Sequence, residues 1–222
     1  MNNKEVLVDS SFFSRLSSDG RNIDDFKKIL GEFDWVPVLH PYIAEHEMDV
    51  FPYFTQLICE GYVRKADYNE FIKEESDRKL YEGYFIDVYE ELRVCLNAKG
   101  GIKKIEKIPV GQDIYSYRKA GMSVGDVHII LMAIFVGIPI ILTEDSDIRL
   151  LRSIAKRYIN SETNQYDLKI YNCTDVIKQI ARKSNTEMSK KELHQILKNI
   201  GKKDQYLDIS QIWEESHNSK DS

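Results

Sequence analysis

The stretch GDVHIILMAIFVGIPIILTEDSD, residues 125–147, is the most apolar run in this chain and has acids at both ends. It predicts a helix over 124–135, a stop at Gly137 and a buried strand over 139–142. Asp126 then lies in the first helical turn, and Asp145 lies just past the carboxyl end of the strand. Ligand sites in open α/β sheets lie outside such strand ends, so we expect both carboxylates to face one crevice.

Composition and charge limit the classes of function. The 222 residues suffice for one large α/β domain or a domain with an appendage, and 42% hydrophobic residues support a substantial core. The net charge of −5, from 31 basic and 36 acidic residues, excludes a protein that coats nucleic acid. A nucleic-acid enzyme remains compatible with this charge only if basic residues are grouped locally.

Cysteine usage and hydropathy predict a soluble cytoplasmic protein. The three cysteines, Cys59, Cys95 and Cys173, show no zinc-binding spacing and favour no disulfide framework. The first residues lack the long apolar run of a signal peptide. The run over 129–142 is too short to span a bilayer and is broken by glycine and proline, so we expect no membrane partner.

The first predicted strand, Glu5 to Val8, ends at an acid. Its continuous apolar run is typical of a strand buried on both faces of a parallel sheet. Asp9, Ser10 and Ser11 follow at the carboxyl edge of that sheet. Two interpretations of Asp9 stay open at this junction, a cap for the next helix and a functional carboxylate.

A second strand, over 35–39, leads into a predicted helix over 42–50 that carries Glu45 and Glu47. Glu45 lies about one turn into this helix, so its side chain is expected to lean back towards the strand end. Glu47 is expected on a different, solvated face, and which of Glu45 and Glu47 is the ligand stays open. The two histidines of this stretch have no partner at zinc spacing and are interpreted as surface or capping residues.

Periodicity predicts the remaining elements. Further helices are expected over 67–80, 81–95, 113–120, 148–159, 175–182, 189–200 and 209–215. A last strand is expected over 167–171, and Ser123 is expected to cap the central helix.

A basic stripe follows the central strand. Arg149, Arg152 and Lys156 share one side of the predicted helix over 148–159, close to the expected acids. Such a stripe suits a nucleic-acid backbone, and a solvated helix face is the alternative interpretation. Arg149 and Arg152 are therefore candidate substrate-binding residues.

Four acids are expected to converge at the carboxyl edge of the sheet: Asp9, Glu45, Asp126 and Asp145. Without compensation they would repel one another, and some would stay protonated. One or two Mg²⁺ or Mn²⁺ ions, which prefer oxygen ligands, remove that problem and can activate water for attack on a phosphodiester. Thr143 and the two serines after Asp9 add hydroxyls for the metal or the substrate.

The segments VLVDSSFF, IAEHE, SVGDVHIILMA and GIPIILTEDSD together resemble a PIN domain, the nuclease family that includes VapC-type toxins. The resemblance covers about residues 4–50 and 110–175. The family pattern places an acid after strand one, which corresponds to Asp9, and a Glu on the next helix, which corresponds to Glu45. It then places an acid on a later buried helix, which corresponds to Asp126. A Thr-x-Asp follows the next strand and corresponds to Thr143 and Asp145. Asp147 corresponds to an additional acid and metal ligand.

The resemblance implies a three-layer α/β/α fold with a central parallel sheet and metal-dependent cleavage of RNA. The expected domain covers residues 1–183, with a helical insert over about 51–109, and a helical extension over 184–222; both additions depart from a minimal toxin of this family. A toxin role implies an antitoxin or other protein partner, and a homodimer is a further expected assembly. One alternative is a PIN-like module that binds RNA or protein with little catalysis. Another is a haloacid-dehalogenase-like phosphatase, but that family requires a second Asp at the position where this chain has Ser11.

Overall fold

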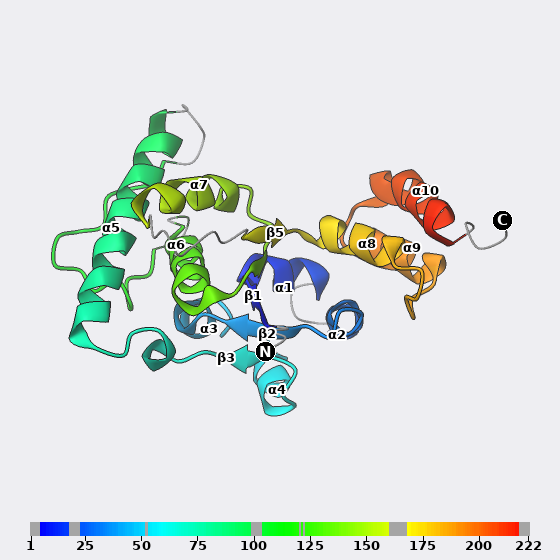
Figure 1. Ribbon diagram of the computed structural model, residues 1–222, viewed down its shortest axis with the longest axis horizontal. Coiled ribbons are helices and arrows are strands. Elements are labelled where there is room, and N and C mark those ends of the chain that lie inside the picture. The colour runs from blue at the N-terminus through cyan, green and yellow to red at the C-terminus, as the bar shows by residue number, and fades with distance from the viewer. Residues whose placement is uncertain are drawn as a thin grey trace.

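Five parallel strands form the centre of the protein (Figure 1). The computed structural model describes residues 5–17, 23–51, 53–98, 104–119, 121, 123–159 and 168–217. The strands are β1 (Glu5–Val8), β2 (Val36–Leu39), β3 (Arg64–Lys65), β4 (Ile140–Leu142) and β5 (Lys169–Tyr171). The predicted parallel sheet is thus confirmed. The two-residue β3 was missed because its polar side chains carry no apolar strand pattern.

The order of the strands, β3-β2-β1-β4-β5, creates a switch point between β1 and β4. The chain adds β2 and β3 on one side of β1 and then returns to add β4 and β5 on the other side. Val8 pairs with Leu142, so Asp9 and Thr143 follow at the same edge. The Asp9 amide donates to the Leu142 carbonyl oxygen at 2.9 Å. Crevices at such switch points are the usual ligand sites of open α/β sheets.

Helices flank the sheet in two groups (Figure 1). The described helices are α1 (Ser10–Leu16), α2 (Asp24–Gly31), α3 (Pro41–His46), α4 (Phe54–Cys59), α5 (Glu75–Ala98), α6 (Val124–Met132), α7 (Ile148–Tyr158), α8 (Cys173–Arg182), α9 (Lys190–Asn199) and α10 (Tyr206–His217). Helices α5, α6 and α7 pack against one another, and α1 and α2 pack against α8. The arrangement is an α/β fold compatible with three layers.

Three local predictions are wrong. Residues 67–80 do not form one helix, because a 3₁₀ turn at Tyr68–Glu70 precedes α5. Residues 113–119 are not helical, and residue 120 lies outside the described ranges. Ser123 precedes α6 with a φ of +52° and makes no capping hydrogen bond with its side chain. The predicted last strand begins at Asp167, which also lies outside the described residues.

A buried chain of hydrogen bonds joins α5 to the edge of the sheet. The Tyr42 amide donates to His40 Nδ1 at 3.0 Å, so His40 Nε2 carries the proton and donates to the Tyr81 hydroxyl at 3.2 Å. The Tyr81 hydroxyl in turn donates to His128 Nδ1 at 2.8 Å, and His128 Nε2 donates to the Ile114 carbonyl at 3.1 Å. Burial lowers the pKa of both imidazoles below the ordinary value, and it lowers that of His128 to about 3. Each polar group in this chain has a partner, so it fixes how α5 meets α3 and α6.

The last two helices pack on α8 and extend the same core. Leu193, Leu197 and Ile209 are fully buried and belong to the hydrophobic cluster that contains the strands. Figure 1 places α8, α9 and α10 at the end of the molecule opposite α5. In the part of the chain that the structure describes, no helix is both long enough and apolar enough to cross a membrane.

Candidate functional site

A pocket of about 420 Å³ lies at the switch point. Four carboxylates from separate parts of the chain line it: Asp9 after β1, Glu47 after α3, Asp126 in the first turn of α6 and Asp145 after β4. The other lining residues are Ser10, Ser11, Tyr42, His46, Arg118, Lys119, Gly121, Ser123, Val124 and Gly125. The sheet and the surrounding helices therefore direct four acids from distant sequence positions to one cavity.

Hydroxyl groups hold the carboxylate of Asp9. Ser11 Oγ donates to Asp9 Oδ2, and Thr143 Oγ1 donates to the same oxygen at 3.0 Å. The Ser11 amide also points to this oxygen, at 3.2 Å, so Asp9 is the N-cap of α1. All these donors approach Oδ2. Asp9 therefore has both of the roles that the sequence left open, because it caps α1 and its carboxylate lines the pocket.

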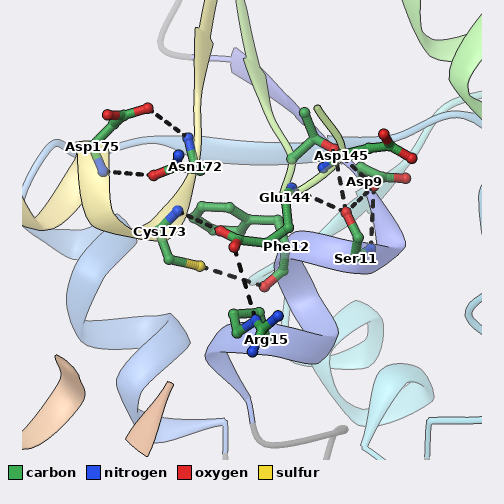
Figure 2. Close-up of polar contacts among 10 residues, drawn as sticks. Asp9, Ser11, Phe12, Arg15, Glu144, Asp145, Asn172, Cys173 and Asp175 are labelled. Carbon is green, nitrogen blue, oxygen red and sulfur yellow. Dashed lines mark hydrogen bonds and ion pairs between the residues drawn. The ribbon is translucent and has the colours of Figure 1, made fainter. Parts of the chain in front are cut away.

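In the loop after β4, the side chains of Glu144 and Asp145 point in different directions (Figure 2). The Asp145 amide donates to Thr143 Oγ1 at 3.0 Å, and the Asp147 amide donates to Asp145 Oδ1 at 2.9 Å. These bonds turn Asp145 into the pocket beside Asp9. Asp147 lies at the N-cap position of α7, outside the pocket lining. The expectation that Asp147 joins the other acids is therefore wrong.

The remaining acid of this loop, Glu144, has a structural role. It turns away from the pocket and accepts a hydrogen bond from the Cys173 amide at 2.7 Å, at the start of α8 (Figure 2). Its other oxygen lies 3.8 Å from Arg15 Nε. The Glu144 amide donates to Ser11 Oγ at 3.1 Å. Both the backbone and the side chain of Glu144 thus connect the loop to α1 and α8.

Glu47 occupies a space that a glycine leaves open. A methyl group at Gly125 would overlap Glu47 Oε1 and lie 3.2 Å from Glu47 Cδ. The other oxygen, Oε2, accepts a hydrogen bond from Ser10 Oγ. The carboxylate therefore lies against the first turn of α6, where the helix dipole favours negative charge.

The acids of the pocket influence one another electrostatically. Burial raises the pKa of Asp126 well above its ordinary value, and the charges of Asp9, Asp145 and Glu47 raise it further. Burial and the charge of Asp9 raise the pKa of Glu47 to about 7, although Ser10 and Arg118 act in the opposite direction. Burial also raises the pKa of Asp9, against the three hydrogen bonds to its carboxylate. The carboxyl groups of the pocket thus oppose one another's ionisation.

The donor set suits a hard divalent cation, but the side chains do not form a closed cage. Among the described residues, no three Asp, Glu, His or Cys side chains meet at one point where they could enclose an ion. The pocket is instead lined by carboxylates that come from four separate segments of the chain. Mg²⁺ is commonly held by one or two carboxylates and keeps several waters, so an open arrangement of oxygen donors fits this ion better than a dedicated cage.

Glu45 lies outside the pocket. Its side chain is 49% exposed and forms an ion pair with Lys65 Nζ at 2.7 Å, next to β3. The prediction that Glu45 lies beside the other acids is therefore wrong. Helix α3 ends at His46 instead of continuing to residue 50, so the chain turns and brings Glu47 to the pocket.

The predicted cations also lie elsewhere. Arg149 is exposed, lies 3.6 Å from Asp175 and lines a separate pocket of about 310 Å³ between α7, β5 and α8. Arg152 donates to the Leu168 carbonyl at 2.9 Å and so fixes the start of β5. Neither side chain lines the pocket of acids, so the prediction that they contact a substrate there is wrong.

The sequence left open whether Glu45 or Glu47 is the ligand, and it gave no indication of two cations that line the pocket, Arg118 and Lys119. Gly125 was the available signal for Glu47, since a glycine in the first turn of a buried helix indicates close approach of another group. No local pattern pointed to Arg118 or Lys119, because their segment was expected to form a helix.

Comparison of the chain with protein-family models, curated proteins and solved structures finds no match in any of the three.

Proposed function

We propose that this protein is a PIN-like ribonuclease that depends on Mg²⁺ or Mn²⁺. The observation that carries the proposal is the set of four carboxylates, from four separate segments, that line one pocket at the switch point of a parallel sheet. Three of them, Asp9, Asp126 and Asp145, stand at the family positions that the sequence suggests. Glu47 takes the place expected for Glu45.

The four carboxylates and the nearby hydroxyls are the groups that would hold the cation. A bound divalent ion would neutralise their charge, lower the pKa of a water molecule and stabilise negative charge on a phosphodiester. The residues of the chain orient the oxygen donors for this role. Ser11 and Thr143 fix Asp9, Ser10 fixes Glu47, and the backbone of Asp147 fixes Asp145.

Cleavage of RNA by matched variants tests the proposal. Asp9→Asn, Asp126→Asn and Glu47→Gln each remove a negative charge from the pocket, and we expect each to lower the rate at least about a hundredfold, the scale of losing an electrostatic catalytic group. Glu45→Gln is the control, because it makes the same chemical change two residues from Glu47 but outside the pocket. EDTA should abolish cleavage by the wild type, and added Mg²⁺ or Mn²⁺ should restore it. Unchanged rates in the pocket variants would refute the proposal.

A second candidate is a PIN-like module that binds RNA or a protein with little catalysis. The observation that favours it is that no three ligating side chains gather at one point in the described residues. Calorimetric titration with Mn²⁺ separates the two candidates. A nuclease should bind Mn²⁺ through Asp126, so that Asp126→Asn weakens binding, whereas the binding module should bind RNA or a protein equally well with and without the ion.

A toxin role makes a separate prediction about partners. An antitoxin would cover the pocket of acids. Expression of the wild type should then arrest growth, the Asp9→Asn variant should not, and co-expression of the antitoxin should relieve the arrest. Growth without arrest at the same level of protein would favour a nuclease without a toxin role.

A further inference from the structure

A non-helical segment, residues 113–119, borders the pocket of acids and contributes two cations to it. Arg118 and Lys119 both line the pocket. The segment precedes α6, which carries Asp126, and follows the described stretch after α5. It belongs to no helix or strand, so its position depends on contacts with other elements.

Three side chains from α3 and α6 donate hydrogen bonds to the backbone of this segment. The Tyr42 hydroxyl donates to the Tyr117 carbonyl at 2.7 Å, one residue before Arg118. His46 Nε2 donates to the Tyr115 carbonyl at 3.1 Å. The third bond is that of His128 to the Ile114 carbonyl described above. The helices that position Glu47 and Asp126 therefore also position Arg118.

The guanidinium of Arg118 acts on the pocket and is available to a ligand. Its positive charge lowers the pKa of both Glu47 and Tyr42, against the larger effects of burial. It forms an ion pair with Asp49 at 3.8 Å, and both of these side chains are about half exposed. Such a surface pair contributes little free energy, so a ligand can displace it at small cost. Lys119, by contrast, is engaged by Glu106 in a close ion pair.

A phosphodiester that enters this pocket meets four carboxylates, which repel it. A cation of the protein in the lining of the same pocket reduces that repulsion, and a guanidinium can donate two parallel hydrogen bonds to the oxygens of one phosphate. Arg149 and Arg152, the cations expected from the sequence, do not line this pocket and contact Asp175 and the Leu168 carbonyl instead. Arg118 is the described side chain with the charge, position and freedom for the contact.

We propose that Arg118 binds the backbone phosphate of the substrate in the acid pocket, and that the bonds from Tyr42, His46 and His128 hold its segment in place. This inference rests on the proposed function in one respect, that the ligand is RNA. It assigns substrate binding to the segment 113–119, and not to the basic side of α7.

Binding of a short fluorescent single-stranded RNA tests the inference, measured both in EDTA and in millimolar Ca²⁺ over a series of salt concentrations. The variants are Arg118→Ala, Arg118→Lys and the control Arg157→Ala, whose arginine is similarly exposed and paired with Glu91 but lies in the last turn of α7. We expect Arg118→Ala to bind about tenfold more weakly and to lower the salt slope by about 0.7, the value for one phosphate contact on a single strand. Arg118→Lys should keep the salt slope, and Arg157→Ala should match the wild type.

The outcomes separate this inference from the proposed nuclease activity. Wild-type affinity in Arg118→Ala, an equal loss in Arg157→Ala, or no binding of RNA by the wild type in either buffer would overturn the role of Arg118. Cleavage in Mg²⁺ is measured in parallel. Binding that depends on Arg118 without any cleavage would refute the nuclease and keep the inference. Cleavage by Arg118→Ala with an unchanged KM would do the reverse.

Discussion

Glu47→Gln is expected to stabilise the protein at alkaline pH and to leave its stability nearly unchanged at acidic pH. In the folded protein, burial and Asp9 raise the pKa of Glu47 from 4.5 to about 7. The folded state therefore binds a proton at this carboxyl more tightly than the unfolded chain does. The resulting loss of stability is absent below pH 4.5, grows as the pH rises, and is complete above about pH 7.

The size of the effect follows from the same values. The difference between 4.5 and about 7 corresponds to about 3 kcal/mol at 1.36 kcal/mol per pKa unit. Because Glu47 is only partly buried and responds to Asp9, we expect about 1–3 kcal/mol at pH 8. For a chain of this size, that amounts to a rise of roughly 2–10 °C in Tm.

Urea unfolding of the wild type, Glu47→Gln and Glu45→Gln at pH 4 and pH 8 provides the measurement. Glu45→Gln removes an exposed ion pair and should change the free energy of unfolding by less than about 1 kcal/mol at pH 8. Equal stabilisation by Glu47→Gln at both pH values, or destabilisation at pH 8, would refute the electrostatic reasoning. Millimolar Mn²⁺ should stabilise the wild type at pH 8 more than the Glu47→Gln variant, because a cation that binds only the folded state shifts the equilibrium towards it.

Two further substitutions test the packing around the site by urea unfolding. Gly125→Ala should push the Glu47 carboxylate aside, because the added methyl group would overlap the end of that flexible side chain. The cost of this shift opposes a gain in helix propensity of about 1 kcal/mol, so the free energy of unfolding should change by less than about 1 kcal/mol. Gly83→Ala, in open space on α5, should stabilise the protein by about 0.5–1 kcal/mol, and a loss of several kcal/mol in Gly125→Ala would contradict the prediction. Tyr81→Phe should cost about 2–4 kcal/mol, because it leaves the two histidine nitrogens bonded to its hydroxyl without partners. Tyr84→Phe, on the same helix but only partly buried, should cost less than about 1 kcal/mol, and a similar loss in both variants would count against the buried chain.

The sequence was sufficient for the sheet and for the acids that directly follow its strands. Continuous apolar runs identify β1 and β4, and a parallel arrangement brings the residues after them to one edge, so Asp9 and Asp145 could be placed together. Asp126 could be placed because its helix is almost entirely apolar. These predictions depend on local patterns and on the general geometry of parallel sheets.

The remainder of the site depends on tertiary contacts that no local pattern reports. Whether Glu45 or Glu47 faces the pocket is decided by a difference of one turn in the length of α3. The position of Arg118 is decided by hydrogen bonds from distant side chains to the backbone of a segment whose own sequence suggests a helix. Such contacts can be identified only after the elements have been assembled.

The direction of the hydrogen bonds through Tyr81 has a consequence for engineering. Backbone groups at both ends dictate the orientation of every proton in that chain, from the Tyr42 amide to the Ile114 carbonyl. His40 is the N-cap of α3, and His128 lies within α6. A shortened protein without α5 would expose both histidines to solvent or leave them without hydrogen-bond partners. Residues 75–98 are thus unsuited to removal in any minimised variant.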